Sequence, residues 1–214
     1  MTIKPRIFKI FLFIFGTTNL FCQKNTAVVF CIGPSITNVQ HIHNGEKDFF
    51  ISPERPFYSI QYHLGINLEH HIFSKDKLRL RYGIGYDKRA SANTAFNKYE
   101  EEGYGFLSLP ISLFYKPIVH REIRFETGGS FLYPIHSSGA RNYVTVFKNY
   151  EIDFTLGIEF HIWKNISFGT RVMQPIRIMN DTGNIVNTNP NILKEIRKFK
   201  THAFQFSFIY KFDL

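Results

Sequence analysis

The 214-residue chain lacks the features that define several common protein classes. Its two cysteines, Cys22 and Cys31, cannot form a disulfide scaffold. Its N-terminal apolar run is far shorter than the ~20 residues that a membrane-spanning helix needs. The formal net charge is +9, but no Lys/Arg-rich run is present, which argues against a nucleic-acid binder. No P-loop, CxxC or HExxH motif occurs, so no common cofactor or metal chemistry is indicated.

Residues 1–22 have the order of a secretory signal peptide. Three cations in the first ten residues precede the apolar stretch Ile10–Phe15, and polar residues follow it. We predict cleavage near Cys22, which would make 1–22 the signal peptide and 23–214 the mature domain. Acylation of Cys22 as a lipoprotein is the second interpretation, and the bulky Phe21 before it disfavours that reading.

The rest of the chain shows apolar and polar residues in alternation, the pattern of strands with two chemically different faces. Useful helical periodicity is absent. In 152–162 every second residue is Ile, Phe or Leu, and in 204–212 every second residue is Phe or Tyr. Eight such segments are expected, at about 27–38, 57–72, 78–89, 104–115, 122–135, 150–163, 166–179 and 200–213.

The connections between these segments alternate in length. Short turns follow the second, fourth and sixth segments, and long polar loops (39–56, 90–103, 136–149 and 180–199) follow the others. Most segments also exceed the ~9–11 residues that cross a bilayer at a tilt. The pattern predicts an all-β fold, an eight-stranded antiparallel up-and-down transmembrane β-barrel with both termini and all short turns in the periplasm.

Side-chain size predicts which face points inward. Eight strands enclose room for modest side chains only, and the face opposite the bulky aromatics carries glycines, serines and charges of both signs. We therefore expect the apolar face outside, with Tyr and Trp near the strand ends, and a plugged lumen of interleaved opposite charges. Glu159 and Arg171 lie at similar depth, and Glu126 could meet Arg79 or Arg81. The expected lumen network is Glu69, Arg79, Arg81, Asp87, Arg124, Glu126, Asp153, Glu159, Arg171 and Arg177.

Several stretches together resemble the PorT-type outer-membrane β-barrel domain family. They are the leader end Phe21-Cys22-Gln23, the strand Phe106–Lys116 with its Leu-x-Leu-Pro-Ile-x-Leu core, the Gly-rich strand Glu126–Phe131, and the pair around 153–159 and 167–169. The resemblance covers about residues 25–214. It implies an eight-stranded barrel in a Gram-negative outer membrane and no enzymatic activity, since only some members are tied to protein secretion or gliding machinery.

The functional hypothesis is a non-enzymatic structural or interaction protein with no catalytic, cofactor or metal site. The runner-up is a soluble secreted or periplasmic lipocalin-like carrier. A small channel and a lipid-modifying barrel enzyme rank lower, because His136-Ser137-Ser138 has no acid nearby in sequence. His41 and His43 are interpreted as loop histidines rather than metal ligands.

The expected partners are those of an envelope protein. They are outer-membrane lipid, lipopolysaccharide, the barrel-assembly machinery and an envelope or secretion protein, with no nucleic acid. The fourth loop, with Lys194, Arg197, Lys198 and nearby Lys200, could meet anionic lipopolysaccharide, and a merely solvated loop is an equal alternative.

Overall fold

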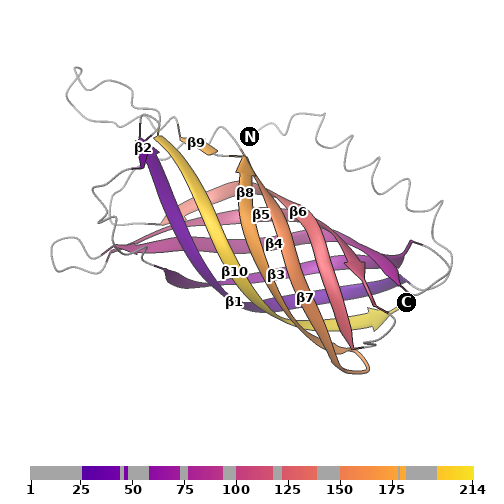
Figure 1. The fold of residues 1–214 in the computed structure, drawn as a ribbon. Coiled ribbons are helices and arrows are strands. Elements are labelled where there is room, and N and C mark those ends of the chain that lie inside the picture. The colour runs from indigo at the N-terminus through magenta and orange to yellow at the C-terminus, as the bar shows by residue number, and fades with distance from the viewer. Residues whose placement is uncertain are drawn as a thin grey trace, which may run out of the picture.

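The computed structural model is a closed antiparallel β-barrel of eight strands (Figure 1). This confirms the predicted fold class. Among the described residues, no helix is long and apolar enough to cross a membrane. The expected leader lies outside the described residues, which are 26–43, 46–47, 58–72, 77–93, 100–117, 122–138, 150–177, 179–181 and 197–214.

Each barrel strand pairs with its neighbour in the chain, and the first and last strands close the barrel. β1 pairs with β10 from Ala27↔Asp213 to Ile42↔Lys198. Two short strands pair beside the loop-end portions of these two strands: β2 (Glu46–Lys47) is antiparallel to the end of β1, and β9 (Met179–Asp181) is antiparallel to the start of β10. The barrel strands are β1 (Thr26–His43), β3 (Ser59–His71), β4 (Leu78–Asn93), β5 (Glu100–Tyr115), β6 (Ile123–Ser138), β7 (Glu151–Trp163), β8 (Ile166–Arg177) and β10 (Arg197–Asp213).

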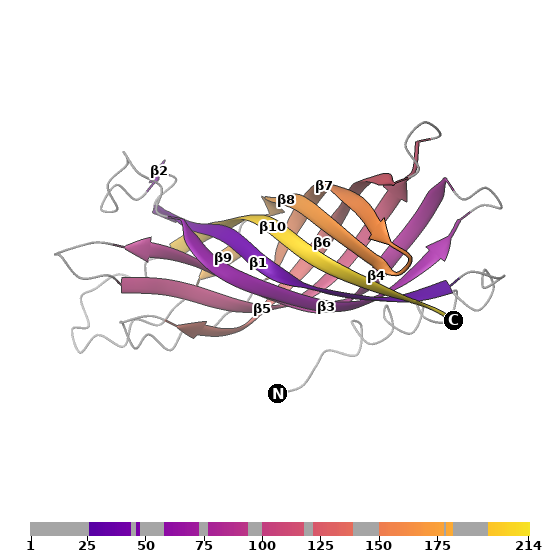
Figure 2. The same ribbon diagram turned by 90° about the horizontal axis from the view of Figure 1, so that it is seen from below.

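The two ends of the barrel differ, as Figures 1 and 2 show. At one end, called the turn end here, Lys164 and Asn165 form the whole β7–β8 connection, and the C-terminus lies beside the start of β1, with Leu214 N–H donating to Thr26 O at 3.0 Å. The opposite end, called the loop end, carries β2, β9 and the long connections.

Several strands run further into the long connections than the alternation predicted. β1 continues to His43, β4 to Asn93 and β6 to Ser138, and β5 begins at Glu100. Backbone pairing explains the difference, because β4 and β5 stay hydrogen-bonded up to Asn93↔Glu100 although the side-chain alternation has ended. The ladder needs only paired backbone groups there, which no sequence pattern reports.

The strands bury one face inside the barrel and expose the other. Side chains of β3 alternate between buried and exposed from Ser59 to Asn67. In β7, Asp153 is 0% exposed and its neighbour Phe154 is 40% exposed. The exterior is therefore apolar, and the interior holds charged, polar and a few aromatic side chains.

Aromatic residues lie on the exterior near both ends, as expected. Tyr58 is exposed at the loop end, and Tyr115, Tyr210 and Trp163 are exposed at the turn end.

Candidate functional site in the barrel lumen

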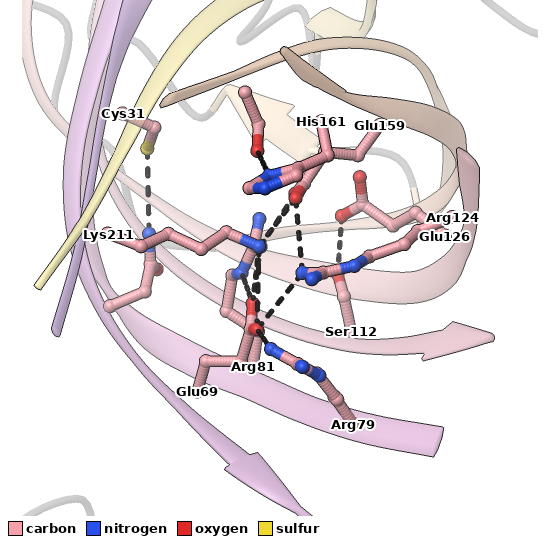
Figure 3. A network of polar contacts seen from close by, with 12 residues as sticks. Cys31, Glu69, Arg79, Arg81, Ser112, Arg124, Glu126, Glu159, His161 and Lys211 are labelled. Atoms are coloured by element: carbon pink, nitrogen blue, oxygen red, sulfur yellow. Dashed lines mark hydrogen bonds and ion pairs between the residues drawn. The ribbon is translucent and has the colours of Figure 1, made fainter. Parts of the chain in front are cut away.

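Two buried glutamates form the centre of a charged cluster in the turn-end half of the lumen (Figure 3). Arg81 donates to Glu69 Oε2 from Nε at 2.9 Å and from Nη2 at 2.5 Å, and its Nη2 also lies 2.6 Å from Glu159 Oε2. Lys211 Nζ lies 2.5 Å from Glu159 Oε1 and 3.4 Å from Glu69. Each glutamate is 1% exposed, so several cations share two desolvated carboxylates.

Two further arginines complete this turn-end cluster, each from the turn-end start of its strand, Arg79 from β4 and Arg124 from β6. Arg79 donates from Nη1 to Glu69 Oε1 at 2.8 Å, and Arg124 Nη1 lies 3.3 Å from the same oxygen. The guanidinium of Arg81 also lies over the Phe114 ring, 4.0 Å from its centroid, which is cation–π distance.

A glycine lets a looser pair form beside the turn-end cluster. Glu126 and Arg171 lie on either side of Gly157 in the register of β6, β7 and β8. A Cβ at Gly157 would come within 2.9 Å of both Glu126 Oε2 and Arg171 Cβ. The pair is 3.8 Å apart, while Ser112 donates to Glu126 at 2.7 Å and Arg171 donates to Gln205 at 2.6 Å.

One arginine dominates the loop-end half of the lumen. Arg89 is fully buried and donates to Asp87 Oδ2 from Nη2 at 2.8 Å and from Nε at 3.0 Å. Its Nη1 lies 2.7 Å from Asp153 Oδ2 and 3.2 Å from Glu151 Oε1. Thr201 accepts from the same nitrogen at 2.7 Å and donates to Glu151. The guanidinium of Arg89 also lies 5.8 Å from the centroid of the Phe106 ring, and Phe106 belongs to a buried apolar cluster with Val39, Tyr104 and Leu132.

Polar side chains lie between the two clusters, and Gln205 links them by accepting from Arg171 at 2.6 Å and donating to Asp87 at 3.0 Å. His63 lies between Ser35 and Ser207, with ring nitrogens 3.1 and 2.8 Å from their hydroxyl oxygens. Two cavities of about 20 Å³ each border Cys31 and Asn67, and each is large enough for roughly one water molecule. Side chains thus fill much of the described lumen, and these two cavities between them are water-sized.

The structure places nine of the ten predicted network residues inside the barrel, in two clusters instead of one. Asp87 and Asp153 belong to the loop-end cluster, and the other seven form the turn-end cluster or the Glu126–Arg171 pair beside it. The side chain of Arg177 lies outside the description. The sequence could not assign the pairs, and those suggested by depth, Glu159 with Arg171 and Glu126 with Arg79 or Arg81, are not among the described ion pairs. Glu159 binds Arg81, Arg124 and Lys211, and Arg171 meets Glu126. Strand order and depth in a tilted barrel, rather than spacing along the chain, decide these contacts.

Sequence reasoning missed three residues of these clusters: Arg89, Glu151 and Lys211. All three have the inward parity of their strands, so the signal was present. Arg89 and Glu151 lie at the ends of the predicted segments, one two-residue period beyond Asp87 and Asp153. Lys211 alternates with Tyr210 and Phe212, which also places it on the polar face.

Two serine–histidine pairs, of the kind that a lipid-modifying enzyme would need, lie inside the lumen and not on the lipid-facing exterior. Ser207 meets His63, and Ser167 lies 3.3 Å from His161. Both serines are buried, at 5% and 0% exposure. His136 lies outside the barrel and stacks on Tyr86 with ring centroids 6.0 Å apart. His41 and His43, expected in a loop, belong to β1, and Ser137 and Ser138 belong to β6, because backbone pairing continues past the side-chain alternation. The side chains of these four residues lie outside the description.

Most of the basic residues expected in or near the fourth loop lie on a strand, and one lies outside the described residues. Arg197, Lys198 and Lys200 belong to β10, so they are not loop residues. Lys194 lies outside the described residues.

Comparison with known proteins shows similarity of fold. No family model matches the chain, and no curated protein does. Among solved structures, OprG from Pseudomonas aeruginosa, an outer-membrane protein, is 12% identical with a TM-score of 0.54, covering 89% of this chain and 97% of its own. The outer-membrane protein AlkL, solved in lipid bilayers, is 11% identical with a TM-score of 0.51, covering 90% and 92%.

The fold and the distribution of side chains define a class. The chain has the closed eight-stranded architecture of outer-membrane β-barrels, with an apolar exterior and a charged, packed interior. At 12% identity the likeness to OprG concerns the fold alone.

Proposed function

We propose that the protein is a non-enzymatic barrel of the Gram-negative outer membrane whose long connections serve as an interaction surface. One observation carries the proposal: large apolar side chains cover the outside while charged side chains fill the inside. Ile60, Leu156 and Phe208 are 77%, 52% and 51% exposed, a cost in water that a bilayer removes.

The filled lumen supports a structural or interaction role over a diffusion pore. Eight strands leave an interior that side chains can occupy, and two ionic clusters occupy it here. Three connections at the loop end, those between β1 and β3, β6 and β7, and β8 and β10, exceed what closure requires, and long loops on a rigid scaffold commonly carry binding. The β4–β5 connection, expected to be long, is reduced to residues 94–99 because both strands extend into it.

A link to a secretion or envelope machinery is the finer part of the proposal. It rests on the resemblance of the strands around Leu107–Leu113 and Glu126–Phe131 to the PorT-type domain. Lipopolysaccharide and the barrel-assembly machinery are the further partners proposed for a protein in this location.

The distribution of side chains disfavours the carrier alternative. A lipocalin-like carrier needs an apolar interior for its ligand and a polar exterior, and the described faces have the opposite arrangement. A lipid-modifying site is also disfavoured, because Ser167 and Ser207 are buried in the lumen away from the apolar exterior.

Cell fractionation with a heat-modifiability gel tests location and fold together. We expect the protein in the outer-membrane fraction, migrating faster unheated than boiled, because the closed barrel resists detergent. Recovery in the soluble periplasmic fraction would overturn the proposal. Planar-bilayer recording tests the filled lumen: steady, large open steps from the wild-type barrel would restore the channel alternative.

A further inference from the structure

The turn-end cluster contains more cations than carboxylates among the described residues. Five basic side chains face the lumen there, against three glutamates. Asp213, the last residue of β10, is exposed at the rim. Buried charge without a counter-charge is costly, so this half of the lumen favours an anion electrostatically. The basic residues are Arg79, Arg81, Arg124, Arg171 and Lys211, and the glutamates are Glu69, Glu126 and Glu159.

Two of the five basic residues retain hydrogen-bond donors that no described residue accepts. Arg79 and Arg124 both reach Glu69 Oε1 through Nη1. The Nε atom of each is buried and has no hydrogen-bond partner within the part of the chain that the structure describes. An unmet buried donor on a charged group carries a large desolvation cost, and the edge of a guanidinium that includes Nε binds oxyanions with two hydrogen bonds.

The position of these arginines allows a ligand to enter from one side. Arg79 and Arg124 are the second residues of β4 and β6 at the turn end, and Arg79 keeps 19% of its side chain exposed. The side chain of Arg89 in the loop-end cluster is 0% exposed. Access is therefore from the turn end. Figure 3 shows the two arginines reaching Glu69 from different strands, with Lys211 on another side of it.

We propose that Arg79 and Arg124 form a binding site for a phosphate-type oxyanion at the turn-end mouth of the lumen. The ligand is free inorganic phosphate or the phosphate of a lipid headgroup, which share the chemistry that these donors recognise. Its oxygens accept from the two Nε donors and offset the excess positive charge. Glu69, itself held by Arg81 and Lys211, holds the Nη1 atoms of both guanidinium groups at one oxygen. The two Nε atoms are buried in the barrel, so binding requires these side chains to turn toward the turn-end mouth.

The test is a titration of the whole purified barrel in detergent with inorganic phosphate, followed by ³¹P NMR line broadening at constant ionic strength with chloride as the comparator. We expect saturable binding that Arg79→Gln and Arg124→Gln each weaken by about tenfold or more. Lys164→Gln removes an exposed cation from the β7–β8 turn and should leave the affinity unchanged. If Arg124→Gln fails to fold, Arg79→Lys, which keeps the charge but lacks Nε, provides the second variant.

A second arm identifies the source of the phosphate. A short-chain phosphatidic acid below its micellar concentration is titrated against the same variants. Binding at least tenfold tighter than inorganic phosphate assigns the site to a lipid headgroup, and equal or weaker binding assigns it to the free ion. Phosphate line broadening that an equal concentration of chloride abolishes, or wild-type affinity in both arginine variants, overturns the site.

Discussion

Glu159 has more cationic partners than its place in the sequence suggests. Arg81, Arg124 and Lys211 all lie within 3.4 Å of its oxygens, and the carboxylate is buried. Breaking a buried ion pair by removing one partner leaves the other charge uncompensated, which costs more than the pair contributes.

We therefore expect Glu159→Gln to lower the free energy of unfolding by about 3–5 kcal/mol in a urea titration of the barrel in lipid. Glu126→Gln is the matched comparison and should lose less, because Glu126 meets its arginine only at 3.8 Å and a glutamine can still accept from Ser112. Equal losses in the two variants would show that the turn-end cluster does not depend on Glu159.

Arg89 has the reverse role, one cation for three carboxylates. Arg89→Met leaves Asp87, Glu151 and Asp153 without their cation, and we expect a loss of about 3–5 kcal/mol at neutral pH. Protonated carboxyls need no counter-charge, so the loss should shrink as the pH is lowered. Urea titrations of both proteins at several pH values measure this, and a penalty independent of pH would contradict the assignment.

Individual strands carry the contrast between the two environments. Along β7, Asp153, Thr155 and Glu159 are at most 2% exposed, while Phe154 and Leu156 are 40% and 52% exposed. The two-residue period of one strand thus places polar residues on the face toward the lumen and apolar residues on the opposite, outer face.

At the scale of this strand, Leu156→Arg should destabilise the barrel by about 2–4 kcal/mol if it faces the bilayer midplane. Ile162→Arg, on the same face near the turn end, is the control and should cost about 0–1 kcal/mol, since the penalty falls toward the membrane surface. Folding titrations in lipid vesicles measure both. Two equally neutral variants would place this face in water.

The ends of the strands follow a different rule from their middles. The ladder between β3 and β4 ends at His63↔Asp87, although both strands continue toward the loop end. Beyond that point the Thr37 hydroxyl donates to Ala90 O at 2.8 Å and accepts from Ala90 N–H at 2.9 Å. A side chain of β1 thus satisfies the backbone of β4 where its ladder with β3 has ended.

The whole barrel has two distinct ends, which makes its orientation testable. The alternation of long and short connections predicts that the long ones face the cell exterior and that the termini face the periplasm. An epitope inserted between Asn93 and Glu100 should be detected by antibody on intact cells. The same epitope after Leu214, at the turn end, should be detected only after permeabilisation. The reverse result would invert the barrel.

How much of the molecule the sequence could predict depends on the range of the forces involved. Parity along the strand reveals whether a residue such as Glu69 or Arg124 faces inward, because the period is local. It cannot reveal that Lys211 on β10 meets Glu69 on β3, since that contact requires barrel closure through β1. The unpartnered Nε atoms of Arg79 and Arg124 were equally out of reach, because they depend on how several side chains share one carboxylate oxygen.

The sequence by itself determined the eight strands, their order, the apolar outer face and the charged inner face. These follow from a two-residue period, from side-chain size and from the lengths of the connections, which are all properties of neighbouring residues. Only the tertiary structure decided that the inner charges divide into two clusters, one built on Glu69 and Glu159 and the other on Arg89. Strand tilt and closure bring inward-facing residues from distant strands to the same depth, and desolvation then makes pairing among them obligatory.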